Sequence, residues 1–299
     1  MPFDSIYRAE LFEGRSLIVT GGGSGIGRCI AHELASLGAH VVIVGRTEAR
    51  LQAVAEEIAE DGGSCRSHCG DIRDEERIRG IIGSIVAESG PVTGLVNCAG
   101  GQFPSPLAQI SQKGFDAVLG TNTVGTHIVS REVYQQSMKD SGGSIVNITA
   151  SVERGVPGLG HSGAARAAVE NFTKTAAVEW GPAGVRVNCV APGFIASSGA
   201  DTYESGSESG RRWLETMRAM VGNIPLGRLG TESEISSIVC FLLSDAGAYV
   251  TGETIGVDGA LPLTPAWHPL GAGPGSPPFR GFHRSRGSRV FDDPSEDEA

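Results

Sequence analysis

The fold of this chain is decided by one stretch near the N-terminus, LIVTGGGSGIGRCI, residues 17–30. A short apolar run opens it, with the length and β-rich composition of a buried strand. Glycines follow at once, and a helical pattern begins after them. Because glycine tolerates positive φ and has no Cβ, such a turn can be tight and lie close to a ligand. The first N–H groups of the next helix then suit a pyrophosphate, so the stretch predicts a dinucleotide site rather than a plain strand-to-helix turn.

Strand-like and helix-like segments alternate along the rest of the chain. The run 40–44 is continuously apolar, as expected of a parallel sheet covered on both faces. The alternation predicts an α/β fold, a single Rossmann-type doubly wound parallel sheet with helices on both faces. Further strands are expected at 66–72, 94–96, 144–148, 185–190 and 254–257, and helices at 48–60 and 75–89.

Two segments interrupt this rhythm. Residues 197–210 are rich in Ser and Gly and precede a helical pattern, so we interpret about 197–222 as a substrate lid. Residues 1–261 then form one reductase-sized domain, and 262–299 form a tail rich in Pro, Gly and Arg. Disorder is the simplest interpretation of the tail. Its aromatic residues favour packing over a neighbouring subunit or the mouth of the site instead: Trp267, Phe279, Phe282 and Phe291.

Composition limits the partners. The chain is 40% hydrophobic and 19% charged, with a formal net charge of −10, which argues against nucleic acid or an anionic membrane surface. No apolar run approaches the ~20 residues of a membrane span, and residues 1–14 lack the pattern of a signal peptide. We expect a cytoplasmic protein with six reduced cysteines. Cys65, His68 and Cys69 have no fourth ligand nearby, so no metal site is predicted.

The residue after the second strand indicates the cofactor. An acidic side chain at this position accepts from the 2′-hydroxyl of NAD, whereas an arginine accommodates a 2′-phosphate. Here Gly45 is followed by Arg46 and the acidic residue is missing. The sequence therefore predicts NADP(H), with a solvated surface arginine as the alternative.

Five motifs, taken in order, resemble the short-chain dehydrogenase/reductase family over about residues 14–261. They are Thr20-Gly21-x-x-x-Gly25-x-Gly27, Asp71-Ile72, Asn97-Cys98-Ala99-Gly100, Thr121-Asn122 and Ala191-Pro192-Gly193-Phe194-Ile195. The resemblance implies a homotetramer in which Asp71 meets the adenine and residues after Pro192-Gly193 meet the nicotinamide carboxamide. The cofactor-binding candidates are Gly21, Ser24, Gly25, Ile26, Gly27, Arg46, Asp71, Ile72, Asn97, Ala99, Gly100, Arg166, Pro192, Gly193 and Ile195.

The catalytic segment departs from the family pattern, which has a tyrosine acid and a lysine four residues later. None of the four tyrosines here has such a lysine. The matching segment, residues 161–169, reads HSGAARAAV and places Ser162 at the tyrosine position and Arg166 at the lysine position. Where the family has a catalytic serine, this chain has Thr149, Ala150 and Ser151.

The missing phenol favours reduction of a C=C bond. Reducing a ketone requires an acid for the alkoxide; a serine is a poor acid, and Arg166 stays charged and cannot relay a proton. Hydride addition to an unsaturated thioester gives an enolate, which aimed hydrogen-bond donors stabilise. The segments 100–106 and 161–166 also resemble the trans-2-enoyl-CoA reductases, with the dienoyl-CoA reductases as near neighbours. In some of these relatives a tyrosine stands where this chain has Glu170, so that role does not transfer.

We therefore predict an NADP-dependent enoyl-thioester reductase. Its catalytic candidates are Asn122 and Ser162 lining the site, Ser151 at the thioester oxygen and Arg166 at the ribose. His161 has the pKa range of an acid, but a hydrogen-bonded or surface histidine is the favoured interpretation. Two other functions stay open: a carbonyl reductase with an unconventional acid, and an NADP-binding or assembly protein that has lost its chemistry.

Overall fold

A seven-stranded, entirely parallel sheet forms the centre of the computed structural model, which describes residues 3–198, 215, 218–265, 267, 269–271, 273 and 275–286. The strand order is β3-β2-β1-β4-β5-β6-β9. The predicted doubly wound α/β fold is confirmed. The strands are β1 (Ser16–Thr20), β2 (His40–Gly45), β3 (Ser64–Cys69), β4 (Val92–Asn97), β5 (Gly143–Ile148), β6 (Val185–Pro192) and β9 (Thr254–Val257).

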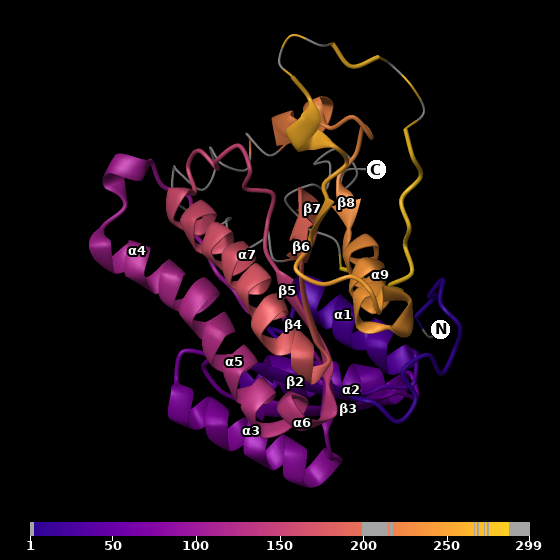
Figure 1. The fold of residues 1–299 in the computed structure, drawn as a ribbon. Helices are drawn as coiled ribbons and strands as arrows, with labels where there is room; N and C mark the ends of the chain where they lie inside the picture. Colours follow the sequence, from indigo (N-terminus) through magenta and orange to yellow (C-terminus); the bar gives the residue numbers. More distant parts are fainter. Residues whose placement is uncertain are drawn as a thin grey trace.

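Helices cover both faces of this sheet (Figure 1). One apolar core lies between the sheet and α1, α2 and α9, and a second lies between the sheet and α3, α5 and α7. Strands buried on both sides read as continuous apolar runs, as β1 and β2 do. The helices are α1 (Gly25–Ser36), α2 (Glu48–Glu60), α3 (Glu75–Ser89), α4 (Gln112–Leu119), α5 (Gly125–Val133), α6 (Lys139–Ser141), α7 (Gly160–Trp180) and α9 (Glu232–Leu243).

The winding of the chain reverses beside β1. This strand pairs with β2 on one side and with β4 on the other, so the connections leave in opposite directions. In open α/β sheets, ligands bind in the crevice outside the carboxyl ends of the strands at such a point. Thr20 ends β1 and Asn97 ends β4, which places the glycine turn and the 97–100 segment at that crevice.

The strands expected at 94–96, 144–148 and 185–190 are each longer in the structure, and the one expected at 66–72 is displaced along the chain. Residues 66–72 were expected, whereas β3 spans Ser64–Cys69. Its limits are set by the ladder with β2, in which His40 pairs with Ser64 and Gly45 with Cys69. Ile72, the last residue of the expected strand, lies in the following loop and is buried in the core cluster between the sheet and α3, α5 and α7.

The structure describes part of the tail but little of the expected lid. Most of the expected lid, namely 199–214, 216 and 217, lies outside the described residues. Residues 275–286 of the tail return to their own chain and lie against α9, α1 and α2, whereas a neighbouring subunit or the site mouth was expected (Figure 1).

Three further findings concern the described part of the chain. None of its helices is long and apolar enough to cross a membrane. No group of three or more His, Cys, Asp or Glu side chains within it is arranged to hold a metal ion. The six cysteines form no disulfide bond.

Candidate functional site

The glycine turn leads the start of α1 into the crevice. Gly21 has a φ of +72°, and a Cβ there would lie 2.9 Å from the Cα of Ala99. A Cβ on Gly27 would collide with the carbonyl oxygen of Gly21, so only glycine lets the helix begin this close to the turn. Ser24 is the N-cap and makes no side-chain capping bond, while Ile26 packs against the core. This turn fits a pyrophosphate held by the N–H groups of α1.

The ends of β1 and β4 are tied together at the same place. The hydroxyl of Thr20 accepts hydrogen bonds from the backbone N–H groups of Cys98 and Ala99, both at 3.1 Å. The amide of Asn97 donates to Asn147 on the neighbouring strand at 2.8 Å. These bonds hold the 97–100 segment rigidly beside the glycine turn.

Three charged side chains lie just beyond the carboxyl ends of β2 and β3. Arg46 is exposed just beyond β2. Arg73 binds the carboxylate of Asp71 through two of its nitrogens, at 2.6 and 3.0 Å. The Arg73 hydrogen bonds, with a contribution from the charge of Arg46, lower the pKa of Asp71 to about 2. Sequence reasoning missed Arg73, although its place two residues after Asp71 could have indicated it.

Three candidates, Gly100, Asn122 and Arg166, lie close together beyond the carboxyl end of β4. A Cβ on Gly100 would lie 2.6 Å from Oδ1 of Asn122 and 2.9 Å from Nη2 of Arg166. Asn122 lies in a π-helical turn, η2 (Gly120–Val124), between α4 and α5. Its amide donates to the carbonyls of Gly101 at 2.7 Å and Val118 at 2.8 Å. Such turns are frequent at functional sites because they redirect a side chain from the regular helix.

Helix α7 supplies the two residues that replace the family pattern. Arg166 donates from Nη1 to the carbonyl of Ile148 at the end of β5, at 2.6 Å. Ser162, one turn earlier and 3% exposed, donates its hydroxyl to Oε1 of Gln102 at 2.5 Å. Gln102 follows the 97–100 segment and was part of the resemblance, but no role was predicted for it. The structure thus pairs Ser162 with an amide from another part of the chain.

Ser151 has a different environment from the one expected. Its hydroxyl donates to Oδ2 of Asp258 at 3.0 Å, and its N–H donates to the carbonyl of Pro192 at 3.2 Å. A Cβ on Gly193 would lie 2.7 Å from the Cα of Asp258, so the Pro-Gly turn packs against the same residue. Ile195 follows in β7 (Ile195–Ala196), which pairs with β8 (Gly230–Thr231). The hydroxyl proton of Ser151 is therefore directed to Asp258. The contact of Ser151 with a thioester oxygen stays a prediction.

His161 is the hydrogen-bonded, buried histidine that was favoured over an acid. Its side chain is fully buried, and Nδ1 accepts the backbone N–H of Ser162 at 2.9 Å. The ring meets the edge of Phe103 at a centroid distance of 4.4 Å. Nε2 of the ring is buried and has no hydrogen-bond partner within the described residues, and the residue packs at the start of α7.

A third residue that sequence reasoning did not select, after Arg73 and Gln102, is Glu170. It lies one turn beyond Arg166 on α7, and its buried Oε1 has no hydrogen-bond partner within the described residues. Burial raises the pKa of the Glu170 carboxyl, with the charge of Glu153 acting the same way and that of Lys174 opposing it. These surroundings favour the protonated form of the Glu170 carboxyl relative to that of an exposed glutamate.

Known proteins resemble the whole of this domain. A family model described as enoyl-(acyl carrier protein) reductase matches residues 21–261. The peroxisomal 2,4-dienoyl-CoA reductase of Rattus norvegicus is 36% identical over 267 residues, covering 88% of each chain. A probable 2,4-dienoyl-CoA reductase of Bacillus subtilis is 35% identical over 256 residues, covering 85% of this chain and 98% of its own.

A solved structure is more similar still. The citronellol catabolism dehydrogenase AtuB of Pseudomonas aeruginosa PAO1 is 54% identical, with a TM-score of 0.76, and the match covers 87% of this chain and 99% of that one. Together with the glycine turn and the crevice, these likenesses identify the chain as a member of the short-chain dehydrogenase/reductase family, whose oxidoreductases bind a nicotinamide cofactor.

Proposed function

We propose that this protein is an NADPH-dependent reductase of a C=C bond conjugated to the carbonyl of an acyl thioester. The observation that carries the proposal is the Ser162–Gln102 pair, which stands where the family pattern has a phenol. The likeness to dienoyl-CoA reductases supports the same reaction class.

The pair suits an enolate better than an alkoxide. When bound, the cofactor supplies a hydride. The hydroxyl of Ser162 and the amide of Gln102 then offer neutral donors to the oxygen on which negative charge develops. Rotation of the Gln102 amide by half a turn presents its NH2 to Ser162 and releases the serine proton toward the substrate.

Arg166 and Glu170 complete the proposed chemistry. The guanidinium of Arg166, beside Asn122 and Gly100, holds the ribose hydroxyls and adds positive potential. It keeps its proton, so it does not act as an acid. Glu170 lies one helical turn further along α7, where burial raises the pKa of its carboxyl, and we assign it the role of orienting the water that protonates the α-carbon.

The test is a comparison of two thioesters of equal chain length. We expect kcat/KM for the trans-2-enoyl-CoA, followed as NADPH absorbance at 340 nm, to exceed that for the 3-oxoacyl-CoA by about 10²–10⁴, the usual contribution of a general acid. A ratio that favours the 3-oxo substrate contradicts the proposal and points to a carbonyl reductase.

A second candidate is a dehydrogenase that interconverts an alcohol and a carbonyl compound. The 54% identity to a citronellol catabolism dehydrogenase favours it. Citronellol with NADP⁺ and citronellal with NADPH therefore belong in the same panel. Tight NADPH binding without turnover of any of these compounds supports a protein that has lost its chemistry.

Arg46 determines the choice of cofactor in this proposal. A charge-assisted bond to the 2′-phosphate contributes about 1.5–3 kcal/mol, so NADPH should bind at least ~10 times more tightly than NADH. We expect Arg46→Ala to abolish most of this preference in fluorescence titrations. Arg66→Ala is the matched control, because Arg66 is an exposed arginine on β3, the strand next to β2, and pairs with Glu88 of α3. Equal affinities in the unmodified protein remove Arg46 from the site.

A further inference from the structure

The described end of the tail is hydrogen-bonded along the first turn of α9. The hydroxyl of Thr231, which caps α9, donates to the carbonyl of Phe279 at 2.6 Å. The N–H of Phe282 donates to the hydroxyl of Ser233 at 3.0 Å. Backbone groups of the tail thus have fixed partners on a helix, which orders residues 275–286 over the protein surface.

Phe282 is the apolar anchor of this segment. Its side chain is 4% exposed and stacks on Phe3, with ring centroids 5.7 Å apart. It also lies 5.0 Å from the ring of His32. The guanidinium carbon of Arg28 is 4.9 Å from the centre of the Phe282 ring, within the range of a cation–π contact. The tail therefore contributes a buried side chain to a core cluster on α1.

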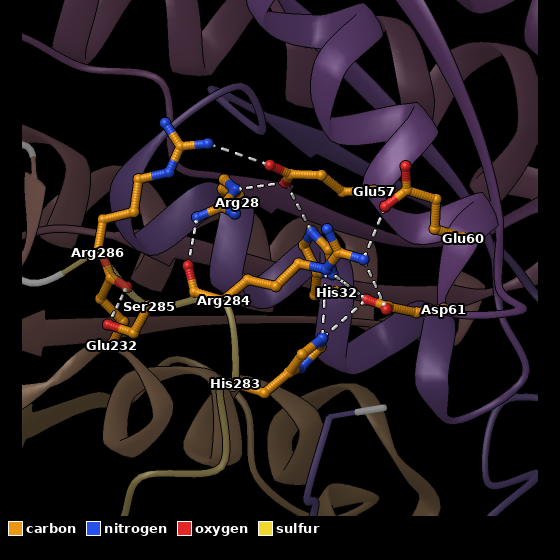
Figure 2. A network of polar contacts seen from close by, with 10 residues as sticks. All are labelled: Arg28, His32, Glu57, Glu60, Asp61, Glu232, His283, Arg284, Ser285 and Arg286. Carbon is orange, nitrogen blue, oxygen red and sulfur yellow. Dashed lines mark hydrogen bonds and ion pairs between the residues drawn. The ribbon is translucent and has the colours of Figure 1, made fainter. Parts of the chain in front are cut away.

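Two arginines of the tail bind carboxylates of α2 and the turn after it. Arg284 contacts Asp61 and Glu60, each at 2.9 Å, and Arg286 contacts Glu57 at 3.2 Å. Figure 2 shows these side chains reaching from the tail toward the end of α2. The charges are complementary: a basic segment covers an acidic helix end.

Arg28 joins this network to the cofactor turn. It is 8% exposed and follows Gly27 in the first turns of α1, where its N–H donates to the carbonyl of Ser24 at 3.1 Å. Its Nε donates to Glu57 at 2.7 Å. Its Nη1 donates to the carbonyl of Arg284 at 3.0 Å (Figure 2). One buried guanidinium therefore contacts α2 and the tail from the first turns of α1, which we expect to bind the cofactor's pyrophosphate.

Glu232 links the same network to the base of the expected lid. This first residue of α9 is 4% exposed. It accepts a hydrogen bond from the hydroxyl of Ser285 at 3.4 Å and interacts with the hydroxyl of Ser197. Burial raises the pKa of Glu232, and these hydroxyls and the charge of Arg28 oppose the rise. Ser285 of the tail and Ser197 at the base of the expected lid thus share one partner, Glu232.

We propose that residues 275–286 act as a positioning strap for the nicotinamide cofactor. The Phe282 ring and the backbone carbonyl of Arg284 contact Arg28 and, through it, hold the glycine turn and first turn of α1. The Arg284 side chain keeps the strap in place by binding Glu60 and Asp61. A turn that is held in its binding geometry before the cofactor arrives loses less conformational freedom on binding. The strap residues touch no reacting atom and serve as positioning residues.

The first test uses point variants of the full chain and needs no substrate. We expect Phe282→Ala and Arg284→Ala to raise the Kd for NADPH by about threefold to tenfold, the range of coupling carried by packed networks. Arg280→Ala is the matched control, an exposed arginine of the same segment outside the network in Figure 2. The conservative variant Phe282→Leu should restore most of the affinity.

Thermal unfolding separates positioning from stability. If the strap variants lower the melting temperature while their Kd stays at that of Arg280→Ala, the proposal is overturned. Should Phe282→Ala fail to fold, Arg284→Ala and Phe282→Leu decide it in the same titration.

A double variant tests the route through Arg28. Because Phe282 is proposed to act on the cofactor through Arg28, the Arg28→Ala/Phe282→Ala pair should bind NADPH no more weakly than Arg28→Ala alone. Additive losses of affinity show that the two side chains act independently, and they contradict the proposed route. This result does not depend on which substrate the enzyme reduces.

Discussion

Arg166→Ala should lower kcat/KM for the enoyl thioester by at least about 10²-fold, mostly through a weaker hold on the cofactor. The Arg166 side chain donates to the carbonyl of Ile148 and lies near Gly100, close to Asn122. Alanine at this position removes the cation from both places. Removing a positive charge from a partly buried site also removes potential that favours an enolate. KM for NADPH, measured at saturating thioester, should rise accordingly.

Arg166→Lys is the informative companion variant. Lysine keeps the charge but has a single donor head in place of the guanidinium fork, so it should recover part of the lost affinity. Arg66→Ala serves again as the control, since Arg66 and its ion-pair partner Glu88 are both exposed. If Arg166→Ala leaves KM for NADPH and kcat at the level of this control, Arg166 has no place in the site.

Ser162→Ala and Gln102→Leu should each reduce kcat for enoyl reduction by about 10²–10³, the cost of losing one donor at a developing oxyanion. The dissociation constant for NADPH should stay nearly unchanged, because the pair is proposed to face the substrate. The hydrogen bond between the two side chains makes them one unit, so the double variant should be little worse than either single one.

Ser105→Ala provides the control for this pair. Ser105 lies in the same loop as Gln102, and its hydroxyl donates to the carbonyl of Pro106, the next residue. Pre-steady-state rates of NADPH oxidation measure the chemical step directly. A normal single-turnover rate in Ser162→Ala argues that the oxyanion has other donors and that the serine only fills space.

Local signals in the sequence determined the architecture. Apolar runs, glycines and the alternation of strand-like with helix-like segments predicted the doubly wound sheet. The helices at 48–60 and 75–89 have the predicted limits. The second of these begins where Asp74 accepts the N–H of Arg77, a cap that is readable within four residues. The glycine turn was recognisable for the same reason, since its geometry depends on neighbours in the chain.

Pairings between distant residues depended on the tertiary structure. Ser162 meets Gln102 across 60 positions, and Arg284 meets Asp61 across 223. The limits of β3 likewise follow the register of β2, because a polar edge strand carries little apolar pattern of its own. Propensity and periodicity act over a few residues, whereas these contacts form only when packing the sheet and its helices brings remote segments within hydrogen-bond reach.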